Sequence, residues 1–314
     1  MKLKIKTAKS DKYCPIIFTI WIVNKNKDFK RGEYYMKSVV FLDVDGTLID
    51  YETKLPDSAR KAVDQARAHG HKVYICTGCS KDEILQRNLC ELDGMILGNG
   101  TYVEDHDHVI MHQAMPLEEV KKVVHWCKER KLAFYLETNS GVYCNDQMIK
   151  DGPAVMIKYG QGKGADLSNA TEKAKSFIDS FTLIHGDEFY REDVNKIDFI
   201  IRDYQDHLDA ITAFPHLAHN TWGGKGELAL FSDLGPTGIN KKHAIEVLLD
   251  YLKLGKEDTI SFGDAKVDLS MFECCGFNVA MGNGGKEIKE AADYITDDVN
   301  EDGLYNAFKY LKLI

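Results

Sequence analysis

The sequence predicts an α/β protein in which a parallel-sheet core is interrupted by one inserted α+β layer. Three features of its 314 residues support this fold class. Short apolar runs alternate with amphipathic helical stretches from residue 38 to residue 97, the middle of the chain has two strands for each helix, and strand–helix alternation returns after residue 240. The length is enough for about two domains, each with its own core.

The first regular elements form a strand–helix–strand unit. Residues 38–42 are apolar and partly β-branched and end at Asp43, which indicates a buried strand. Small apolar residues recur at helical spacing over 58–69, before Gly70, and residues 72–76 form a second strand. Short connections favour a parallel βαβ unit. The elements expected next are a helix at 81–90, a strand at 94–97 and a hairpin through 101–103 and 108–111.

The middle of the chain has a different rhythm. A helix with one apolar face is predicted at 117–130, followed by a strand pair at 132–137 and 141–144. Two strands for each helix favour an antiparallel α+β layer over a continuation of the parallel sheet. The remaining elements expected in this layer are a helix near 171–181, a strand at 196–201, a helix near 205–214 and a strand at 228–231.

The tail returns to the parallel rhythm, and this return sets the predicted domain boundaries. The expected elements are a helix at 241–252, a strand at 259–262, a helix at 269–274, a strand at 278–280 and a helix near 303–311. We therefore expect a core made of residues 36–115 and 224–314. The inserted layer spans residues 116–223, and residues 1–35 form an N-terminal extension.

Composition and charge exclude several classes of function. The net charge is −9, and no run of Lys and Arg is dense enough to follow a nucleic-acid backbone. No stretch approaches the roughly 20 apolar residues that a membrane helix needs. The eight cysteines are scattered without a disulfide or zinc-ribbon spacing, which is typical of a reducing compartment. We expect a cytoplasmic protein that binds neither nucleic acid nor membrane, as a monomer or homodimer.

The head of the chain resembles a signal peptide only in part. An apolar run at 15–23 follows several lysines, but a polar, Lys- and Asn-rich segment follows it, with no small-residue cleavage site. We expect residues 1–35 to lie outside the native protein, because the core strand begins directly after Met36 and codons for residues 31–33 can contain a purine-rich ribosome-binding sequence. The alternative is that the apolar run adds an edge strand to the core.

Two carboxylates follow the first core strand. Asp43 and Asp45 lie one residue apart, at the end of a strand where open α/β sheets bind ligands, and Gly46 allows a sharp turn beside them. One carboxylate can act as a nucleophile while the other transfers protons. A calcium loop would need alternating oxygen ligands and a closing Glu, which the residues after Gly46 do not supply. A turn with solvated acids remains an alternative for this segment alone.

Three further segments carry polar groups at strand ends or helix starts. Thr77 and Gly78 follow the second strand and offer a hydroxyl and backbone N–H groups to an anion. Lys241 lies in the first turn of a helix, directly after Asn240, which is a good N-cap. A cation in the first turn opposes the helix dipole, so an anionic binding partner is a better explanation for Lys241 than helix stability. A solvated lysine is the alternative. Asp264 and Asp268 follow an apolar strand, in the segment Gly263-Asp-Ala-Lys-Val-Asp268, and two acids at a turn suit Mg²⁺ as oxygen ligands.

In their order, and at their strand ends, these four motifs resemble those of the haloacid dehalogenase-like hydrolases, and most closely the Cof-like, type IIB phosphatases. Further segments that look like this subgroup are Gly98-Asn-Gly100, Gly238-Ile-Asn-Lys241, Val279-Ala-Met-Gly-Asn283 and Glu301-Asp-Gly303. The spacing agrees. Asp43 and Thr77 are 34 residues apart, whereas 164 residues separate Thr77 from Lys241, which leaves room for an insertion at the type II cap position.

The resemblance implies a Rossmann-like core, an α+β cap that confers substrate specificity, and a Mg²⁺-dependent phosphatase. Asp43 would be the nucleophile that forms an aspartyl-phosphate, and Asp45 the acid and then the base. Asp45 must then keep a proton near neutral pH, which calls for burial or a nearby like charge. The substrate would be a small phosphorylated metabolite: a sugar phosphate, a nucleotide or a cofactor phosphate. The implied phosphate-binding residues are Thr77, Gly78 and Lys241, and the implied metal ligands are Asp43, Asp45 through its backbone carbonyl, Asp264 and, nearby or directly, Asp268.

Two positions depart from the subgroup's pattern. Cys79 stands where an Arg is usual after Thr-Gly, and Val267 stands where an Asn is usual before the last acid. Both changes remove polar groups near the phosphate, so a catalytically weak sensor of a phosphorylated ligand remains an alternative. Another is a phosphotransferase or mutase with the same intermediate, in which the cap excludes water and a second hydroxyl takes the phosphoryl group. Cys76 and Cys79 also form a C-x-x-C, which suggests either a redox or metal pair or, as we expect, a core cysteine at a strand end plus a chance substitution.

Overall fold

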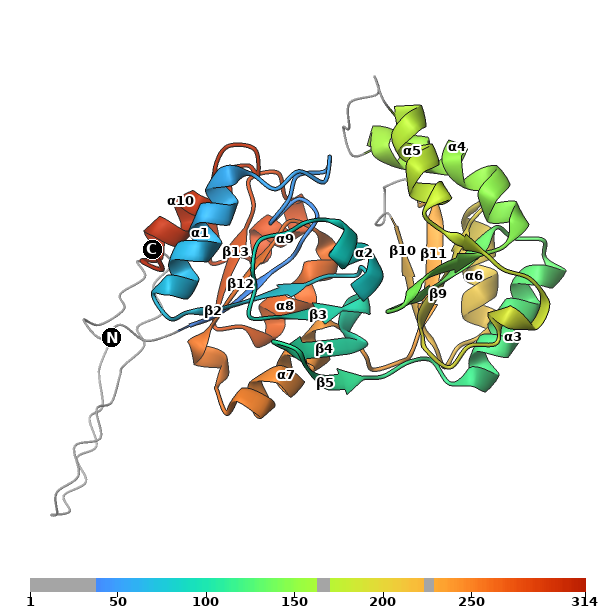
Figure 1. Cartoon of the computed structure of the whole chain (residues 1–314), viewed down its shortest axis with the longest axis horizontal. Coiled ribbons are helices and arrows are strands. Elements are labelled where there is room, and N and C mark those ends of the chain that lie inside the picture. The colour runs from blue at the N-terminus through green and yellow to red at the C-terminus, as the bar shows by residue number, and fades with distance from the viewer. Residues whose placement is uncertain (1–37, 163–169, 223–228) are drawn as a thin grey trace, which may run out of the picture. The chain divides into compact units, whose positions relative to one another are not determined.

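The computed structural model describes residues 38–162, 170–222 and 229–314 (Figure 1). The prediction for residues 1–35 lies outside the described residues, as does the start of the strand predicted at 228–231. Within the described ranges the chain forms two β-sheets with helices packed on them, which confirms the predicted α/β class. No helix in these ranges is both long enough and apolar enough to traverse a lipid bilayer.

The first sheet has eight strands in the order β14-β13-β12-β1-β2-β3-β4-β5. Its strands are β1 (Val39–Leu42), β2 (Lys72–Cys76), β3 (Gly94–Leu97), β4 (Tyr102–Asp105), β5 (His108–His112), β12 (Thr259–Gly263), β13 (Phe277–Ala280) and β14 (Tyr294–Ile295). The six strands from β14 to β3 are parallel, and the hairpin of β4 and β5 adds an antiparallel edge. Leu42 pairs with both Ile75 and Phe262, so β1, β2 and β12 end at the same edge.

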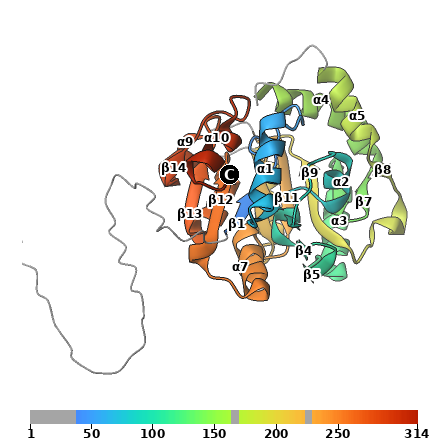
Figure 2. The same cartoon turned by 60° about the vertical axis from the view of Figure 1, so that its left-hand side comes forward.

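Helices cover both faces of the first sheet. The helices in this part of the chain are α1 (Asp57–Ala68), α2 (Lys81–Gln86), α7 (Lys241–Leu252), α8 (Leu269–Cys274), α9 (Lys286–Ala291) and α10 (Gly303–Tyr310). Helices α1 and α10 lie side by side in both views (Figures 1 and 2), and Phe308 of α10 packs against Phe262 at 5.3 Å between ring centroids. Phe41 points to the other face, into an apolar cluster with residues of α7 and α8. The central strands are therefore buried on both sides.

The second sheet has six strands in the order β10-β11-β9-β6-β7-β8. Its strands are β6 (Phe134–Thr138), β7 (Gly141–Cys144), β8 (Thr182–Leu183), β9 (Val194–Ile200), β10 (Ala218–Thr221) and β11 (Phe231–Gly235), and its helices are α3 (Leu117–Glu129), α4 (Asp146–Gly162), α5 (Ala170–Asp179) and α6 (Tyr204–Ala213). All neighbouring strands are antiparallel except β7 and β8. The predicted antiparallel α+β layer is confirmed.

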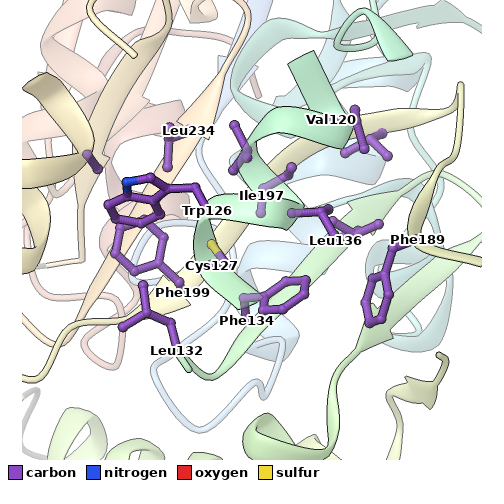
Figure 3. Close-up of a cluster of buried hydrophobic side chains, with 14 of the residues drawn as sticks. Val120, Trp126, Cys127, Leu132, Phe134, Leu136, Phe189, Ile197, Phe199 and Leu234 are labelled. Carbon is purple, nitrogen blue, oxygen red and sulfur yellow. The ribbon is translucent and has the colours of Figure 1, made fainter. Parts of the chain in front are cut away.

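One face of the second sheet carries an aromatic and aliphatic core (Figure 3). Trp126 of α3 meets Phe199 of β9 edge-on, with 5.5 Å between ring centroids, and Phe134 of β6 lies 5.0 Å from Phe189. Val120 of α3 is fully buried in the same cluster. Burying side chains of this size stabilises the fold by roughly 1.5–3 kcal/mol each, so this apolar face fixes α3 on the sheet.

The structure differs from the predicted elements where sequence patterns are weak. Helix α4 was not expected, since Pro153 interrupts its pattern, and strand β10 is polar and short. The helix predicted at 81–90 ends at Gln86, and Asn88 adopts a left-handed φ of 46°. The boundary predicted at residue 224 falls before β11, which belongs to the second sheet because it pairs with β9 and β10.

Candidate active site

Three of the predicted site residues follow directly on neighbouring strands of the first sheet. Asp43 follows β1, Thr77 follows β2 and Asp264 follows β12, and these strands are parallel and in register at their carboxyl ends. The amide of Asp43 donates to the carbonyl of Phe262 at 3.0 Å, which ties the β1 loop to β12. Ligands of open parallel sheets bind at this edge, so the fold places the three residues where a site is expected.

A buried lysine lies between two carboxylates at this edge. Lys241 Nζ is 2.7 Å from Asp43 Oδ1 and 2.7 Å from Asp268 Oδ1, and the lysine side chain is only 1% exposed. Lys241 is the first residue of α7, and the side chain of Asn240 accepts a hydrogen bond from the His243 amide at 2.9 Å, which confirms the predicted N-cap. The start of α7 therefore places the Lys241 ammonium group between the carboxylates of Asp43 and Asp268.

The predicted metal-binding acids come together around this lysine. Carboxylate oxygens of Asp43, Asp264 and Asp268 all lie within 4.8 Å of one another, and all three residues are buried. The second oxygen of Asp268 accepts hydrogen bonds from the amides of Asp264 at 3.2 Å and Ala265 at 3.0 Å. Asp268 thus holds both the Asp264 loop and Lys241. Three acids and one lysine leave an excess of negative charge, which suits a cation.

Burial and neighbouring charges shift the pKa values of both Asp43 and Lys241. Burial, reinforced by the nearby carboxylate of Asp268, raises the pKa of Asp43 well above its usual value, although Lys241 opposes this effect. Burial alone would lower the pKa of Lys241, but the carboxylates of Asp268 and Asp43 raise it well above its usual value. Lys241 therefore stays charged, and its contact favours an ionised Asp43.

The turn after Asp43 fits closely against the Asp264 loop. Gly46 has a φ of 82°, and a Cβ there would lie 2.5 Å from Asp264 Oδ2 and 2.7 Å from the Tyr51 ring. The Tyr51 hydroxyl donates to Asp264 Oδ2, and burial together with this carboxylate raises the pKa of Tyr51. Asn283 donates to the Gly46 carbonyl at 2.8 Å. Glycine is therefore required at position 46, and Tyr51 is a site neighbour that sequence reasoning missed.

Thr77 lies at the same edge, beside the carboxylates. It is 2% exposed, and its hydroxyl oxygen accepts from the Cys79 amide at 3.2 Å. Burial raises the pKa of the preceding Cys76 thiol, on which the charges of Lys241 and Asp43 also act. Gly78 packs close to Asn99, where a Cβ would lie 3.1 Å from the amide oxygen. The structure thus brings the predicted Thr77 segment to the carboxylates.

Asp45 has surroundings that the sequence did not predict. Its side chain is 42% exposed instead of buried, and the nearest charge is opposite instead of like. Arg87 Nη1 lies 2.7 Å from Asp45 Oδ1 and 2.8 Å from Oδ2. Sequence reasoning missed Arg87, which directly follows α2. The one available signal was the missing arginine at position 79.

The cysteines of the described residues are free thiols. Burial raises the pKa of Cys79 well above its usual value, as it does for Cys76. A thiolate is therefore disfavoured at both positions, and within the described ranges the one cluster of metal-ligating side chains contains no cysteine. These observations favour the interpretation of Cys76 as a core cysteine and of Cys79 as a chance substitution over a redox or metal pair.

The second sheet carries a separate group of buried charges. Lys196 Nζ lies 3.0 Å from Glu137 Oε1 and 3.3 Å from Asp198 Oδ1, and Asp233 is directly opposite Asp198 on the next strand. Burial raises the pKa of Asp198 to about 7, against the effect of Lys196. The Tyr135 hydroxyl, Glu137 Oε2 and Asp198 Oδ2 have no hydrogen-bond partner among the described residues. Such groups are costly in a core unless something binds them.

Comparisons with known proteins agree with this geometry. The model of the haloacid dehalogenase-like hydrolase family matches residues 40–308. The 5-amino-6-(5-phospho-D-ribitylamino)uracil phosphatase YitU of Bacillus subtilis is 28% identical over 280 residues, which cover 86% of this chain and 96% of that protein.

Solved structures give the same result. A sugar phosphatase of haloacid dehalogenase subclass IIB matches with a TM-score of 0.69 and 26% identity, over 88% of this chain and 100% of that one. BT1666 of Bacteroides thetaiotaomicron, a phosphatase of the same superfamily, matches with a TM-score of 0.73 and 25% identity, over 92% of this chain and 100% of that one. The resemblance found in the sequence is confirmed, as is the expected enzyme class of phosphatase. The chain therefore belongs to the haloacid dehalogenase-like hydrolase family.

Proposed function

We propose that this protein is a Mg²⁺-dependent phosphatase that hydrolyses a small phosphorylated metabolite through an aspartyl-phosphate at Asp43. The observation that carries this proposal is the group of three buried carboxylates around Lys241 at the ends of β1 and β12. An ionised Asp43 repels a phosphate dianion unless positive charge is nearby. Lys241 supplies one such charge, and the remaining carboxylates provide the ligands for a second.

The residues at this site fit Mg²⁺. Their side-chain donors are all oxygens, the ligands that Mg²⁺ prefers, and the carboxylates outnumber the lysine. Asp43, Asp264 and the backbone carbonyl of Asp45 would hold the ion. Both oxygens of Asp268 already bind Lys241 and two backbone amides, which supports a role for Asp268 in orienting these groups. Bound Mg²⁺ supplies positive charge that offsets the phosphoryl oxygens and lowers the repulsion of the nucleophile.

Asp43 carries out the phosphoryl transfer. A carboxylate oxygen of Asp43 forms a bond to phosphorus while the bond from phosphorus to the ester oxygen breaks. The Thr77 hydroxyl, the Gly78 backbone and Lys241 bind the phosphoryl oxygens and orient them for in-line attack. The contact between Lys241 and Asp43 favours the ionised form of the nucleophile, whereas burial favours its protonated form.

Asp45 moves the proton in both steps. It gives a proton to the ester oxygen as that oxygen leaves as an alcohol. It then takes a proton from water as the water oxygen attacks phosphorus and releases inorganic phosphate, which regenerates the Asp43 carboxylate. The exposed Asp45 carboxylate is open to solvent, as the second step requires.

The inserted layer, with the second sheet, is proposed as the cap that selects the substrate. Of the polar residues in its strands, Asn145 is bound to the backbone of Phe134 and Leu132, and Arg191 covers the Tyr143 ring at 4.0 Å. Tyr135 and Glu137 retain free acceptor or donor capacity among the described residues. A cap rich in carboxylates favours a leaving group with hydroxyl or amino groups over one with further negative charge.

We propose a cytoplasmic location for this activity.

A magnesium-supplemented assay against phosphorylated metabolites tests the proposal. Wild-type protein should release inorganic phosphate with Mg²⁺ and lose this activity with EDTA, while Asp43→Asn should be inactive although folded. Transfer of the phosphoryl group to a second hydroxyl without free phosphate would indicate a phosphotransferase or mutase. Binding of a phosphorylated ligand without any turnover would indicate a sensor, and either result would contradict the proposed phosphatase.

A further inference from the structure

Arg87 contacts both carboxylate oxygens of Asp45 through one guanidinium nitrogen. One nitrogen, Nη1, lies 2.7 Å and 2.8 Å from the two carboxylate oxygens, and the other, Nη2, lies 3.2 Å from Cys79 Sγ. Arg87 follows the last turn of α2, and its side chain is 17% exposed. A guanidinium nitrogen that contacts both oxygens holds the carboxylate at a fixed distance and restricts its rotation.

Asp45 depends on this contact for its orientation. Its side chain is 42% exposed, and within the described part of the chain Arg87 is the one cation bonded to it. The other neighbour, the Cys79 thiol, is a weak donor at 3.7 Å from Oδ2. Without the guanidinium, an exposed carboxylate is free to take several rotamers, and a proton carrier that must reach an ester oxygen would be misplaced for part of the time.

The small residue at position 79 makes room for Arg87. Cys79 Sγ contacts both Asp45 and the guanidinium, so a longer side chain at position 79 would have to occupy the space that Arg87 now fills. The Arg87 guanidinium therefore reaches Asp45 from the far end of α2. It passes Cys79, whose side chain is too short to bring a cation to Asp45. The two positions form one steric and electrostatic unit beside Asp45.

We propose that Arg87 is a positioning residue for Asp45 and supplies the cation that position 79 lacks. This inference rests on the proposed function of Asp45 as the acid and base. Arg87 acts through Asp45, so it affects the proton-transfer steps and not the binding of the phosphoryl group.

The test compares Arg87→Met with a matched control and two kinds of ester. Arg67→Met is the control, because Arg67 is also partly buried, with 20% exposure, and also paired with acids, but lies away from the site. Glycerol 2-phosphate has an alkoxide leaving group that needs a proton, whereas 4-nitrophenyl phosphate does not. We expect Arg87→Met to lower kcat for glycerol 2-phosphate at least about tenfold, with KM changed less than about threefold.

One further measurement and two double variants separate positioning from other effects. The rate of the first nitrophenol burst of Arg87→Met should stay within about threefold of wild type, because that step needs no acid. In an Asp45→Asn background, adding Arg87→Met should change kcat less than about twofold, because Arg87 acts through the Asp45 carboxylate and that group is already absent. The double variant Cys79→Arg with Arg87→Met should recover most of kcat, because it returns a guanidinium to Asp45 from the adjacent position.

Several results would overturn the inference. Equal losses in glycerol 2-phosphate turnover and in the nitrophenol burst, a rise in KM instead of a fall in kcat, or full additivity with Asp45→Asn would show that Arg87 binds the phosphate or acts independently of Asp45. A loss matched by Arg67→Met, with a lowered melting temperature in both, would show a structural role only. Absence of Mg²⁺-dependent turnover by the wild type would instead refute the proposed function, and the role of Arg87 with it.

Discussion

Lys241→Met should destabilise the protein strongly, and in a way that depends on pH. Lys241 makes two charge-assisted hydrogen bonds of 2.7 Å at 1% exposure, so its loss leaves Asp43 and Asp268 buried without their cation. Removing one partner from a buried ionic group costs about 3–5 kcal/mol, and methionine retains most of the apolar stem volume. We expect a loss of about 3–5 kcal/mol in the free energy of unfolding at pH 7.

The sign of the pH dependence follows from the pKa of Asp43. Burial and Asp268 already raise this pKa, and loss of Lys241 removes the group that opposes them. A carboxyl with a raised pKa in the folded state contributes stability at low pH, and this contribution disappears as the pH rises through the folded value. The destabilisation by Lys241→Met should therefore be smaller at pH 5 than at pH 8.

Urea denaturation in EDTA at several pH values measures this effect without metal. Lys242→Met is the matched control, because the neighbouring Lys242 is 39% exposed and pairs with Glu273 at 3.2 Å on the surface. The control should change the free energy of unfolding by less than about 1 kcal/mol at every pH. Equal losses for the two variants, or a Lys241→Met loss that does not shrink at pH 5, would refute the reasoning.

Four other predictions concern the site loops and the second sheet. Asp43→Asn should abolish phosphate release in a folded protein, because an amide does not attack phosphorus, and appreciable turnover would exclude Asp43 as the nucleophile. Asp264→Ala should raise the Mg²⁺ concentration for half-maximal activity more than about tenfold, with partial recovery at high Mg²⁺. Gly46→Ala should cost more than Gly238→Ala in urea unfolding, since both have positive φ, with about 1–2 kcal/mol of strain, but only Gly46 would clash with its surroundings. Burial raises the pKa of Asp198 to about 7, so between about pH 4 and pH 8 the wild type should lose on the order of 2–4 kcal/mol of stability relative to Asp198→Asn, and a flat difference would contradict that shift.

Much of the fold follows from local periodicity. The apolar face of α1 and the buried strands β1 and β2 repeat at the spacings of an amphipathic helix and a buried strand, and these elements were predicted nearly to their ends. The central carboxylates could be predicted for a related reason. Parallel strands that end at one edge bring Asp43 and Asp264 together, although the two residues are far apart in sequence.

The unpredicted features depend on contacts between distant segments. Tyr51 reaches Asp264 because the Gly46 turn folds the chain back, and no local pattern marks a tyrosine for this contact. Arg87 reaches Asp45 from the residue that follows α2, and its guanidinium also contacts Cys79. The environment expected for Asp45 was wrong for the same reason, since burial and neighbouring charge are properties of the packed chain.

The central claim is that a phosphoryl group is transferred to Asp43, and acid-quenched mass spectrometry tests it most directly. Wild-type protein, Mg²⁺ and a substrate that is turned over would be mixed, quenched within the first turnover, treated with borohydride to trap the acyl phosphate, and digested. We predict that the modification lies at Asp43 and is absent without Mg²⁺ and in Asp43→Asn. Modification at another residue, or steady turnover with Asp43 unmodified throughout, would contradict the account.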